Sequence, residues 1–279
     1  MTSNLQYHLR HTEPGHLFLG LGNGNQPVTI NLDSDTPHIL LSVPSNNGKS
    51  VTCTLLAAQI LHNNGNVTYI DLKRDTQWVK TNPNTDDVIP KVTYCKTIDE
   101  AFPQLVELGH LMHARYETKD INPDYSPHRI LIVAEELNMT ADLLGTHWTD
   151  LKKDGTSPAL KALRSLMYAG RACRMHVLAV TQYGTAQAFG ANGAAARENA
   201  TPILGAGSSE KAWELVAPQI DERPDMTNHR GRMYLIQGND YEPVQVGYLT
   251  NPQARDWATN GTPPASDEAT EAELPGWLQ

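Results

Sequence analysis

The sequence has few cysteines and no long apolar run. These two features argue against a cysteine-based zinc protein and against a protein with a membrane-spanning helix. Its 3 cysteines, among 279 residues, stand alone without the C-x-x-C spacing of a cysteine-based zinc site. Isolated thiols are typical of a reducing compartment, so we expect a cytoplasmic protein. The apolar runs have strand length, far below the ~20 residues of a membrane-spanning helix, and no signal-peptide pattern is seen. We therefore expect no direct membrane insertion, and membrane association only through a membrane or adaptor protein.

Positive charge is also scarce. The chain has 22 Lys and Arg residues against 31 Asp and Glu residues, a formal net charge of -9. This balance speaks against a protein that coats nucleic acid nonspecifically, but it permits a motor that touches DNA at a small basic lining. The 11 histidines lack the H-E-x-x-H spacing of a helical zinc site, so we interpret most of them as structural or solvated.

The most informative stretch of the chain is residues 38–50. A short apolar run is followed by turn-forming residues, then Gly48-Lys49-Ser50, then a helix-compatible segment. Backbone N–H groups at the start of such a helix surround phosphate groups. Gly48 allows close approach, Lys49 supplies a charge for the β- and γ-phosphates, and the Ser50 hydroxyl completes a Mg²⁺ shell. The stretch predicts an ATP site made of Pro44, Ser45, Asn46, Asn47, Gly48, Lys49, Ser50 and Val51.

One position departs from the phosphate-binding pattern G-x-x-x-x-G-K-[ST]. Val43 stands where the pattern has its first glycine. Asn46 and Asn47 adopt left-handed backbone conformations at modest cost, so the loop can still form its cradle of N–H groups. On the tripeptide alone, the alternative is an ordinary Gly-Lys-Ser turn between a strand and a helix.

The rest of the chain predicts an α/β fold with a mostly parallel central sheet flanked by helices. Residues 1–15 read as an extended polar arm, residues 16–32 as a β-hairpin, and residues 251–279 as an acidic, proline-containing, disordered tail. Apolar runs predict strands at residues 38–43, 67–70, 92–95, 130–134, 175–182, 231–236 and 242–248. Helical spacing predicts helices after Ser50 and at residues 98–116, 158–171 and 211–216.

Two carboxylates follow one of the buried strands. Glu135 and Glu136 come directly after the apolar run of residues 130–134. Because open α/β sheets bind ligands at the carboxyl ends of their strands, we expect this pair to face the same crevice as the phosphate-binding loop. There Glu135 would hold Mg²⁺, directly or through water, and Glu136 would polarise the attacking water. A solvent-exposed Glu-Glu pair is the alternative. Gln182, at the tip of another strand, would sense the γ-phosphate.

Lysine and arginine gather in one segment of this acidic chain. Most charged runs are solvated surface, but this one is the densest in positive charge, which makes it the first candidate for a DNA-facing surface. The residues concerned are Lys152, Lys153, Lys161 and Arg164.

The sequences of these segments and their order along the chain resemble the motor domain of the FtsK/SpoIIIE/HerA group of ATPases, especially FtsK-like proteins of actinobacterial plasmids and phages. The resemblance extends over residues 16–250. Seven pieces in the same order are more specific than any one of them. They are Gln26-Pro27-Val28, Pro37–Leu41 with Gly48-Lys49-Ser50, Tyr69–Lys73, Glu135-Glu136-Leu137, Gly170–His176 with Ala179–Gln182, Ser208-Ser209, and Gly231–Tyr234.

The resemblance implies a RecA-like P-loop ATPase core that assembles into a homo-oligomeric ring, typically a hexamer, and moves double-stranded DNA. On the matching positions Lys49 and Ser50 contact phosphate and Mg²⁺, Glu135 takes the place of the Walker B aspartate, Glu136 is the catalytic base and Gln182 is the sensor. Residues 202–208 contain no arginine to reach a neighbouring subunit's site. Arg197 and Arg171 are the substitutes.

Three functional hypotheses follow from these patterns. The first is an ATP-dependent translocase of double-stranded plasmid or phage DNA, which joins the site chemistry to the resemblance. The second is an FtsK-like ATPase that acts on a protein substrate in secretion, and the acidic charge fits it. The third is an ATP-binding scaffold with little hydrolysis, prompted by Val43 and by Glu135, which is one methylene longer than aspartate.

Overall fold

The computed structural model describes residues 2–82, 84–181, 198–224 and 229–260. The predictions for Gln182, for Arg197 and for the tail beyond residue 260 lie outside the described residues. No helix in the described part is long and apolar enough to cross a membrane.

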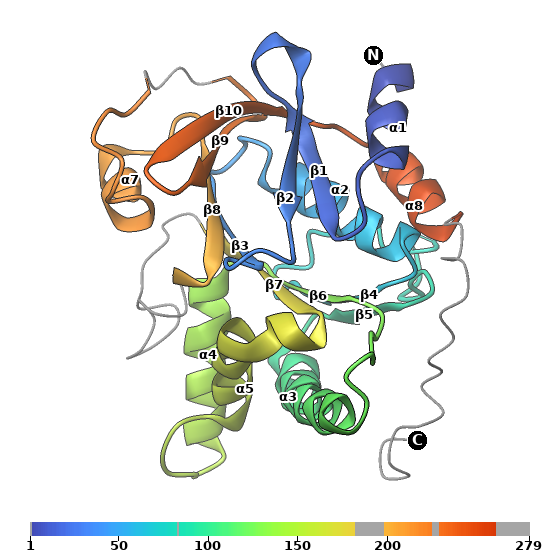
Figure 1. Ribbon diagram of the computed structural model, residues 1–279. Coiled ribbons are helices and arrows are strands. Elements are labelled where there is room, and N and C mark those ends of the chain that lie inside the picture. Colours follow the sequence, from blue (N-terminus) through green and yellow to red (C-terminus); the bar gives the residue numbers. More distant parts are fainter. Residues whose placement is uncertain (1, 83, 182–197, 225–228, 261–279) are drawn as a thin grey trace.

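A ten-stranded sheet organises the fold, in the order β2-β1-β10-β9-β8-β3-β7-β6-β4-β5 (Figure 1). Its parallel block consists of β3 (His38–Ser42), β4 (Asn66–Ile70), β5 (Val92–Cys95), β6 (Ile130–Ala134), β7 (Met175–Thr181) and β8 (Ala200–Gly205). An antiparallel extension continues from β8 with β9 (Arg232–Gln237), β10 (Asp240–Val246), β1 (His16–Leu21) and β2 (Pro27–Asn31). The predicted α/β class, the mostly parallel centre and the N-terminal hairpin are confirmed.

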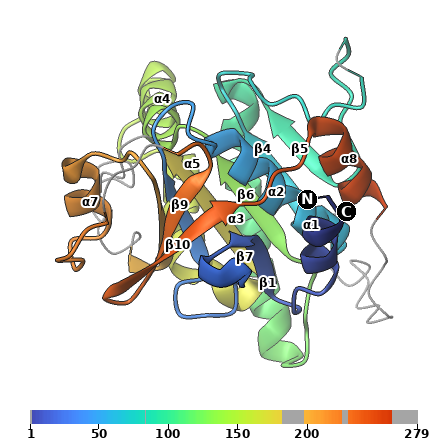
Figure 2. The same cartoon turned by 90° about the horizontal axis from the view of Figure 1, so that it is seen from above.

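Helices cover both faces of the parallel block (Figures 1 and 2). One face carries α2 (Lys49–His62) and the other carries α3 (Ile98–Ile121), α4 (Leu137–Asp150) and α5 (Pro158–Ala169). Alternate side chains of each strand serve the two cores, as the period of two requires. On β6, Leu131 and Val133 join the core under α2, while Ile130 and Ile132 join the core with α3 and α5. The shorter elements are η1 (Asn23–Asn25), η2 (Gly170–Cys173) and α7 (Glu210–Val216).

Both ends of the described chain correct the sequence prediction. The expected extended arm contains helix α1 (Thr2–Arg10), and the first part of the expected disordered tail is helix α8 (Asn251–Thr259). Leu9 and Ala254 are buried in the core under α2, so each helix gains apolar contacts that only the folded chain supplies. The two helices lie side by side near the C-terminal end of α2, where the Trp257 ring stacks on His62.

Candidate active site

The loop between β3 and α2 forms without the first glycine of the phosphate-binding pattern. Val43 continues the strand: its N–H donates to the Thr181 carbonyl (3.1 Å), and its side chain is fully buried. Room for that side chain comes from the neighbouring strand β8, since a Cβ on Gly205 would lie 2.9 Å from Val43 Cγ1. A glycine distant in sequence thus supplies the space at this bend, and Val43 fits the loop.

The turn itself uses two left-handed residues. Asn46 has a φ of 65° and Gly48 a φ of 98°, so the expectation of a left-handed asparagine holds for Asn46. Gly48 is the N-cap of α2, and a Cβ there would approach Gly231 Cα to 3.3 Å. No side chain caps the first turn of α2, and no acidic residue lies in it. This helix end therefore presents N–H groups and positive dipole character to an anion.

Glu136 occupies the centre of the charged cluster. It adopts a left-handed conformation (φ 50°, ψ 58°) as the N-cap of α4, and such backbone outliers concentrate at functional sites. Its Oε1 atom accepts a hydrogen bond from Lys49 Nζ and lies 3.2 Å from Lys73 Nζ. Burial alone would raise the pKa of this carboxyl, but the hydrogen bonds and charges of Lys49 and Lys73 lower it below the usual value. Glu136 is therefore an anion held by two lysines.

Glu135 has a different environment although it is the adjacent residue. Its N–H donates to the Ile70 carbonyl (3.0 Å), so it extends β6 and shares the α2 face with Leu131 and Val133. The side chain is buried, and the Tyr69 hydroxyl donates to its Oε1 atom (2.9 Å). Burial, helped by the charge of Asp71, raises the pKa of the Glu135 carboxyl to about 7.

Asp71 shapes the loop that carries Lys73. The buried Asp71 carboxylate accepts hydrogen bonds from the N–H groups of Lys73 (3.1 Å), Arg74 (3.0 Å) and Thr76 (2.8 Å). The Tyr94 hydroxyl donates to the same carboxylate at 3.1 Å. A fixed loop at the end of β4 thus presents Lys73 to Glu136. Lys73 is a site residue that was not predicted from the sequence. Its signal was its position three residues after the end of a parallel strand.

The phosphate-binding loop, Lys73 and the two glutamates line a pocket of about 730 Å³ at the carboxyl ends of the parallel strands. The predicted meeting of the phosphate-binding loop and the Glu135-Glu136 pair is found in this pocket. Six of the eight predicted ATP residues line it, and Pro44 and Asn47 belong to the loop without lining it. The wall beside β4 and β6 contains Lys73, Asp75, Glu135 and Glu136, and the wall beside β9 and β10 contains Arg230, Gly231, Gln245, Val246 and Tyr248.

The pocket contains both of the oxygen donors that the sequence predicted for Mg²⁺. In the described part of the chain, no group of three His, Cys, Asp or Glu residues forms a metal site by itself. A Mg²⁺ ion that binds with a nucleotide needs fewer protein ligands, because phosphate oxygens and waters complete its octahedron. The Ser50 hydroxyl and the Glu135 carboxylate both line the pocket, and their chemistry fits that role.

The other predicted residues that the structure describes lie away from the pocket. Arg171, in η2, precedes β7 at the opposite edge of the sheet, where its Nη1 donates to Asp35 Oδ1 (2.7 Å) and to the Ser34 carbonyl (3.1 Å). It therefore cannot serve the phosphate-binding loop of its own chain. Lys152, Lys153 and Lys161 are exposed around the connection between α4 and α5, whereas Arg164 is half-buried.

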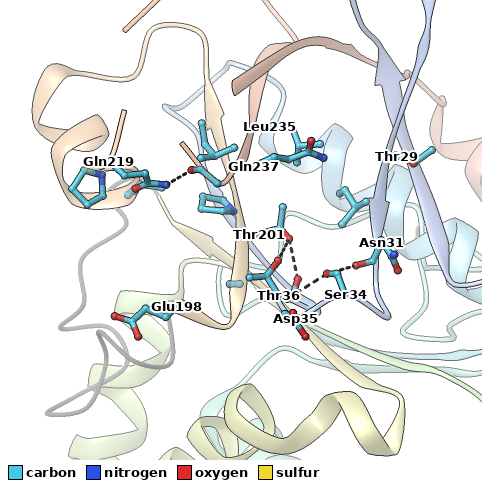
Figure 3. A pocket seen from close by; sticks show the side chains of 17 residues that line it. Thr29, Asn31, Ser34, Asp35, Thr36, Glu198, Thr201, Gln219, Leu235 and Gln237 are labelled. Carbon is cyan, nitrogen blue, oxygen red and sulfur yellow. Dashed lines mark hydrogen bonds between the residues drawn. The ribbon is translucent and has the colours of Figure 1, made fainter. Parts of the chain in front are cut away.

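A second pocket, of about 630 Å³, opens at the amino edge of the sheet, between β2, β8 and β9 (Figure 3). Hydrogen bonds within its wall join the Thr36 and Thr201 hydroxyls (2.9 Å) and run from Gln219 Nε2 to the Gly238 carbonyl (3.0 Å). Asp35 and Glu198 line it, and none of its described lining residues is a lysine or arginine. Its chemistry does not suit a phosphate.

No protein-family model matches this chain, and no curated protein matches it. Solved ATPase structures do. The chain is similar to the pCW3 conjugation coupling protein TcpA in its monomer form with ATPγS (TM-score 0.66, 19% identity, 87% of this chain and 68% of that chain). It is also similar to EssC ATPases 2 and 3 from Geobacillus thermodenitrificans (TM-score 0.65, 17% identity, 90% of this chain and 44% of that chain).

A third similar structure is Thermomonospora curvata EccC, ATPases 2 and 3, in complex with a signal sequence peptide (TM-score 0.63, 17% identity, 85% of this chain). This chain covers 41% of that EccC chain. At these identities the likeness shows the fold. The fold is that of P-loop ATPase domains, as the sequence predicted.

Proposed function

We propose that this protein is an FtsK-like motor ATPase that hydrolyses ATP to move double-stranded DNA of a plasmid or phage. The observation that carries the proposal is the position of Glu136 between Lys49 and Lys73, inside the pocket of the phosphate-binding loop. A phosphate cradle and a carboxylate base at one site are the two parts that ATP hydrolysis requires.

In the proposed reaction Lys49 exchanges its partner. The phosphates of ATP bind to the N–H groups of the loop and attract the Lys49 ammonium away from Glu136. Glu136 then accepts a hydrogen bond from the attacking water, and Lys73 keeps the carboxylate anionic and oriented. Mg²⁺, held through Ser50 and Glu135, would neutralise charge that develops on the phosphate oxygens.

The proposed motor is a homo-oligomeric ring, a hexamer, with DNA in its pore. The resemblance to FtsK-like motor domains supports the ring. The similarity to a conjugation coupling protein, solved in its monomer form, supports a role in conjugation and not an oligomeric state. Lys152, Lys153, Lys161 and Arg164 are the proposed DNA-facing residues. Arg171 and Arg197 are the proposed arginines that reach a neighbouring subunit, and Gln182 is the proposed sensor.

A protein substrate is the second candidate. The EccC structure to which this chain is similar holds a signal sequence peptide, and a net charge of -9 suits a basic or neutral partner better than nucleic acid. A scaffold that binds ATP with little hydrolysis is the third. It is prompted by Glu135, which is one methylene longer than aspartate and whose carboxyl has its pKa raised by burial to about 7.

Steady-state phosphate release, measured with and without long duplex DNA, tests the proposal. We expect duplex DNA to raise turnover and added salt to weaken the stimulation, because phosphate contacts release counterions. Turnover that DNA leaves unchanged would contradict a DNA motor, and stimulation by a peptide would favour the protein substrate. Tight ATP binding without phosphate release would establish the scaffold.

A further inference from the structure

The pocket continues beyond the phosphate-binding loop along β9 and β10. Gly231 directly precedes β9 and Val246 is the last residue of β10, and the Val246 N–H donates to the Gly231 carbonyl (2.9 Å). Arg230 contacts the loop directly, with its Nε 3.4 Å from the Asn46 carbonyl. The close approach of Gly48 to Gly231 Cα places the same wall against the start of α2. This wall and the phosphate-binding loop thus form one continuous surface.

The order of the strands gives a bound nucleotide its direction. Glu136 follows β6, which lies on one side of β3, whereas β9 and β10 lie on the other side. The γ-phosphate must lie nearest Glu136, because that carboxylate orients the attacking water. The α-phosphate and the nucleoside then extend away from Glu136. They extend toward the wall that contains Arg230, Gln245 and Tyr248.

The side chains of this wall suit a nucleobase. Tyr248 lines the pocket, and 61% of its surface is exposed. A lone exposed aromatic residue is ordinary, but one beside a phosphate cradle offers a face on which a base can stack. Gln245 Nε2 donates to the Arg230 carbonyl (3.3 Å), which fixes the amide and assigns Oε1 as its acceptor. An acceptor at this place matches the exocyclic amino group of adenine and opposes the carbonyl oxygen of guanine.

We propose that Arg230, Gln245 and Tyr248 form the nucleobase subsite of the pocket, with Tyr248 stacking on the base and Gln245 selecting adenine. The inference rests on the proposed function, since it assigns the second half of the same ATP site. The ATP site then has two parts with different tasks. The phosphate-binding loop binds the phosphates of any nucleotide, and the wall of Arg230, Gln245 and Tyr248 recognises the base.

Calorimetric titration with ATP, GTP and inorganic tripolyphosphate tests the subsite, because tripolyphosphate has no base. We expect Tyr248→Ala to weaken ATP binding about 10-fold, the loss of one base-aromatic stack, and to leave tripolyphosphate affinity unchanged. Tyr248→Phe should retain wild-type ATP affinity. Gln245→Leu should reduce the preference for ATP over GTP. Tyr168→Ala, which removes another exposed tyrosine, on α5, is the matched control and should bind all three probes like the wild type.

Equal weakening of ATP and tripolyphosphate by Tyr248→Ala would overturn the subsite, as would an unchanged ATP affinity. Thermal unfolding of each variant identifies any loss that comes from the fold instead of the pocket. A wild-type protein that binds tripolyphosphate and hydrolyses ATP, but shows no effect of Tyr248→Ala, would leave the proposed function in place and reject the subsite alone. A wild-type protein that binds none of the three probes would reject both.

Discussion

The two edges of the parallel sheet both carry ionisable residues, but they use them differently. At the amino edge the charges are paired with each other: Arg129 Nη2 donates to Asp33 Oδ2 (2.6 Å), and Arg171 donates to Asp35. At the carboxyl edge two lysines share the single carboxylate of Glu136, beside a helix end without a side-chain cap. Two ammonium groups that share one carboxylate, beside the positive end of a helix, suit an anion. The comparison separates charges that complete the fold from charges arranged for a ligand.

The buried histidines at the amino edge show what a completed network looks like. His176 Nδ1 lies 3.0 Å from the Pro37 carbonyl, and its Nε2 lies 3.0 Å from Arg129 Nη1. His38 Nδ1 accepts a hydrogen bond from the Val177 N–H (3.0 Å). Burial lowers the pKa of His38 to about 4 and that of His176 to about 3, so both rings are neutral at pH 7. These groups serve the fold in one protonation state.

The largest expected effect is at the carboxyl edge. Glu136→Gln removes the base but keeps the shape of the side chain, so turnover of ATP should fall about 10²- to 10⁴-fold while ATP binding persists. Phosphate-release kinetics and a binding titration measure the two quantities. The control at the amino edge is Asp33→Asn, which weakens the pair with Arg129 and should leave turnover of the folded protein unchanged. Equal losses in both variants would remove the distinction between the edges.

The next prediction concerns pH and the amino edge. Since the folded-state pKa of His38 lies below its unfolded value, the unfolded chain binds more protons, and stability is lost as pH falls from 6.5 toward 4. The loss attributable to His38 at pH 4 is about 3 kcal/mol. His38→Gln should flatten the dependence of the unfolding free energy on pH by that amount, as measured by urea unfolding. The exposed His110→Gln is the control, and parallel curves for both variants would contradict the prediction.

Two glycines allow a test in which both edges are strained. A Cβ at Gly205 would meet Val43 beside the phosphate-binding loop, and one at Gly170 would lie 2.2 Å from the Met175 carbonyl oxygen at the amino edge. Overpacking of this kind costs about 1–3 kcal/mol, so both alanine variants should unfold more easily. Only Gly205→Ala should also weaken ATP binding, because it displaces Val43 and Pro44. Weaker ATP binding in Gly170→Ala would show that strain spreads across the sheet.

The sequence predicted the parts of this molecule that local patterns determine. Apolar runs located the parallel strands, and the rule that ligands bind at their carboxyl ends brought Lys49 and Glu136 to one pocket, although their chemical roles stay predictions. Residues that depend on distant pairing were missed. Lys73 reaches Glu136 because β4 pairs with β6. Tyr248 reaches the pocket because it follows β10, which joins the sheet through β9 and β8 on the other side of the phosphate-binding loop.

The departure at Val43 shows the same limit. From the sequence it is a missing glycine, yet the structure provides the required space through Gly205 on the neighbouring strand. Helix α8 was missed although Thr250 and Gln253 form a capping box at its start and a proline stands in its first turn. Both α8 and α1 gain stability from the core under α2, which the local sequence does not contain. A pattern read along the chain cannot include space or apolar surface that another segment supplies.

The smallest expected effect concerns Lys73. Its substitution tests whether this lysine acts on the ATP site or is an ordinary surface lysine. Lys73→Met removes one of the two cations beside Glu136, and a partly exposed ion pair of this kind contributes up to about 1 kcal/mol. We expect turnover to fall by about fivefold with ATP affinity unchanged, and Lys73→Arg to restore it. The matched control is Lys119→Met, whose ammonium donates to the Ala172 carbonyl near the amino edge. If Lys73→Met instead raised turnover, Lys73 would restrain the base, and the charges at the carboxyl edge would hold the site inactive.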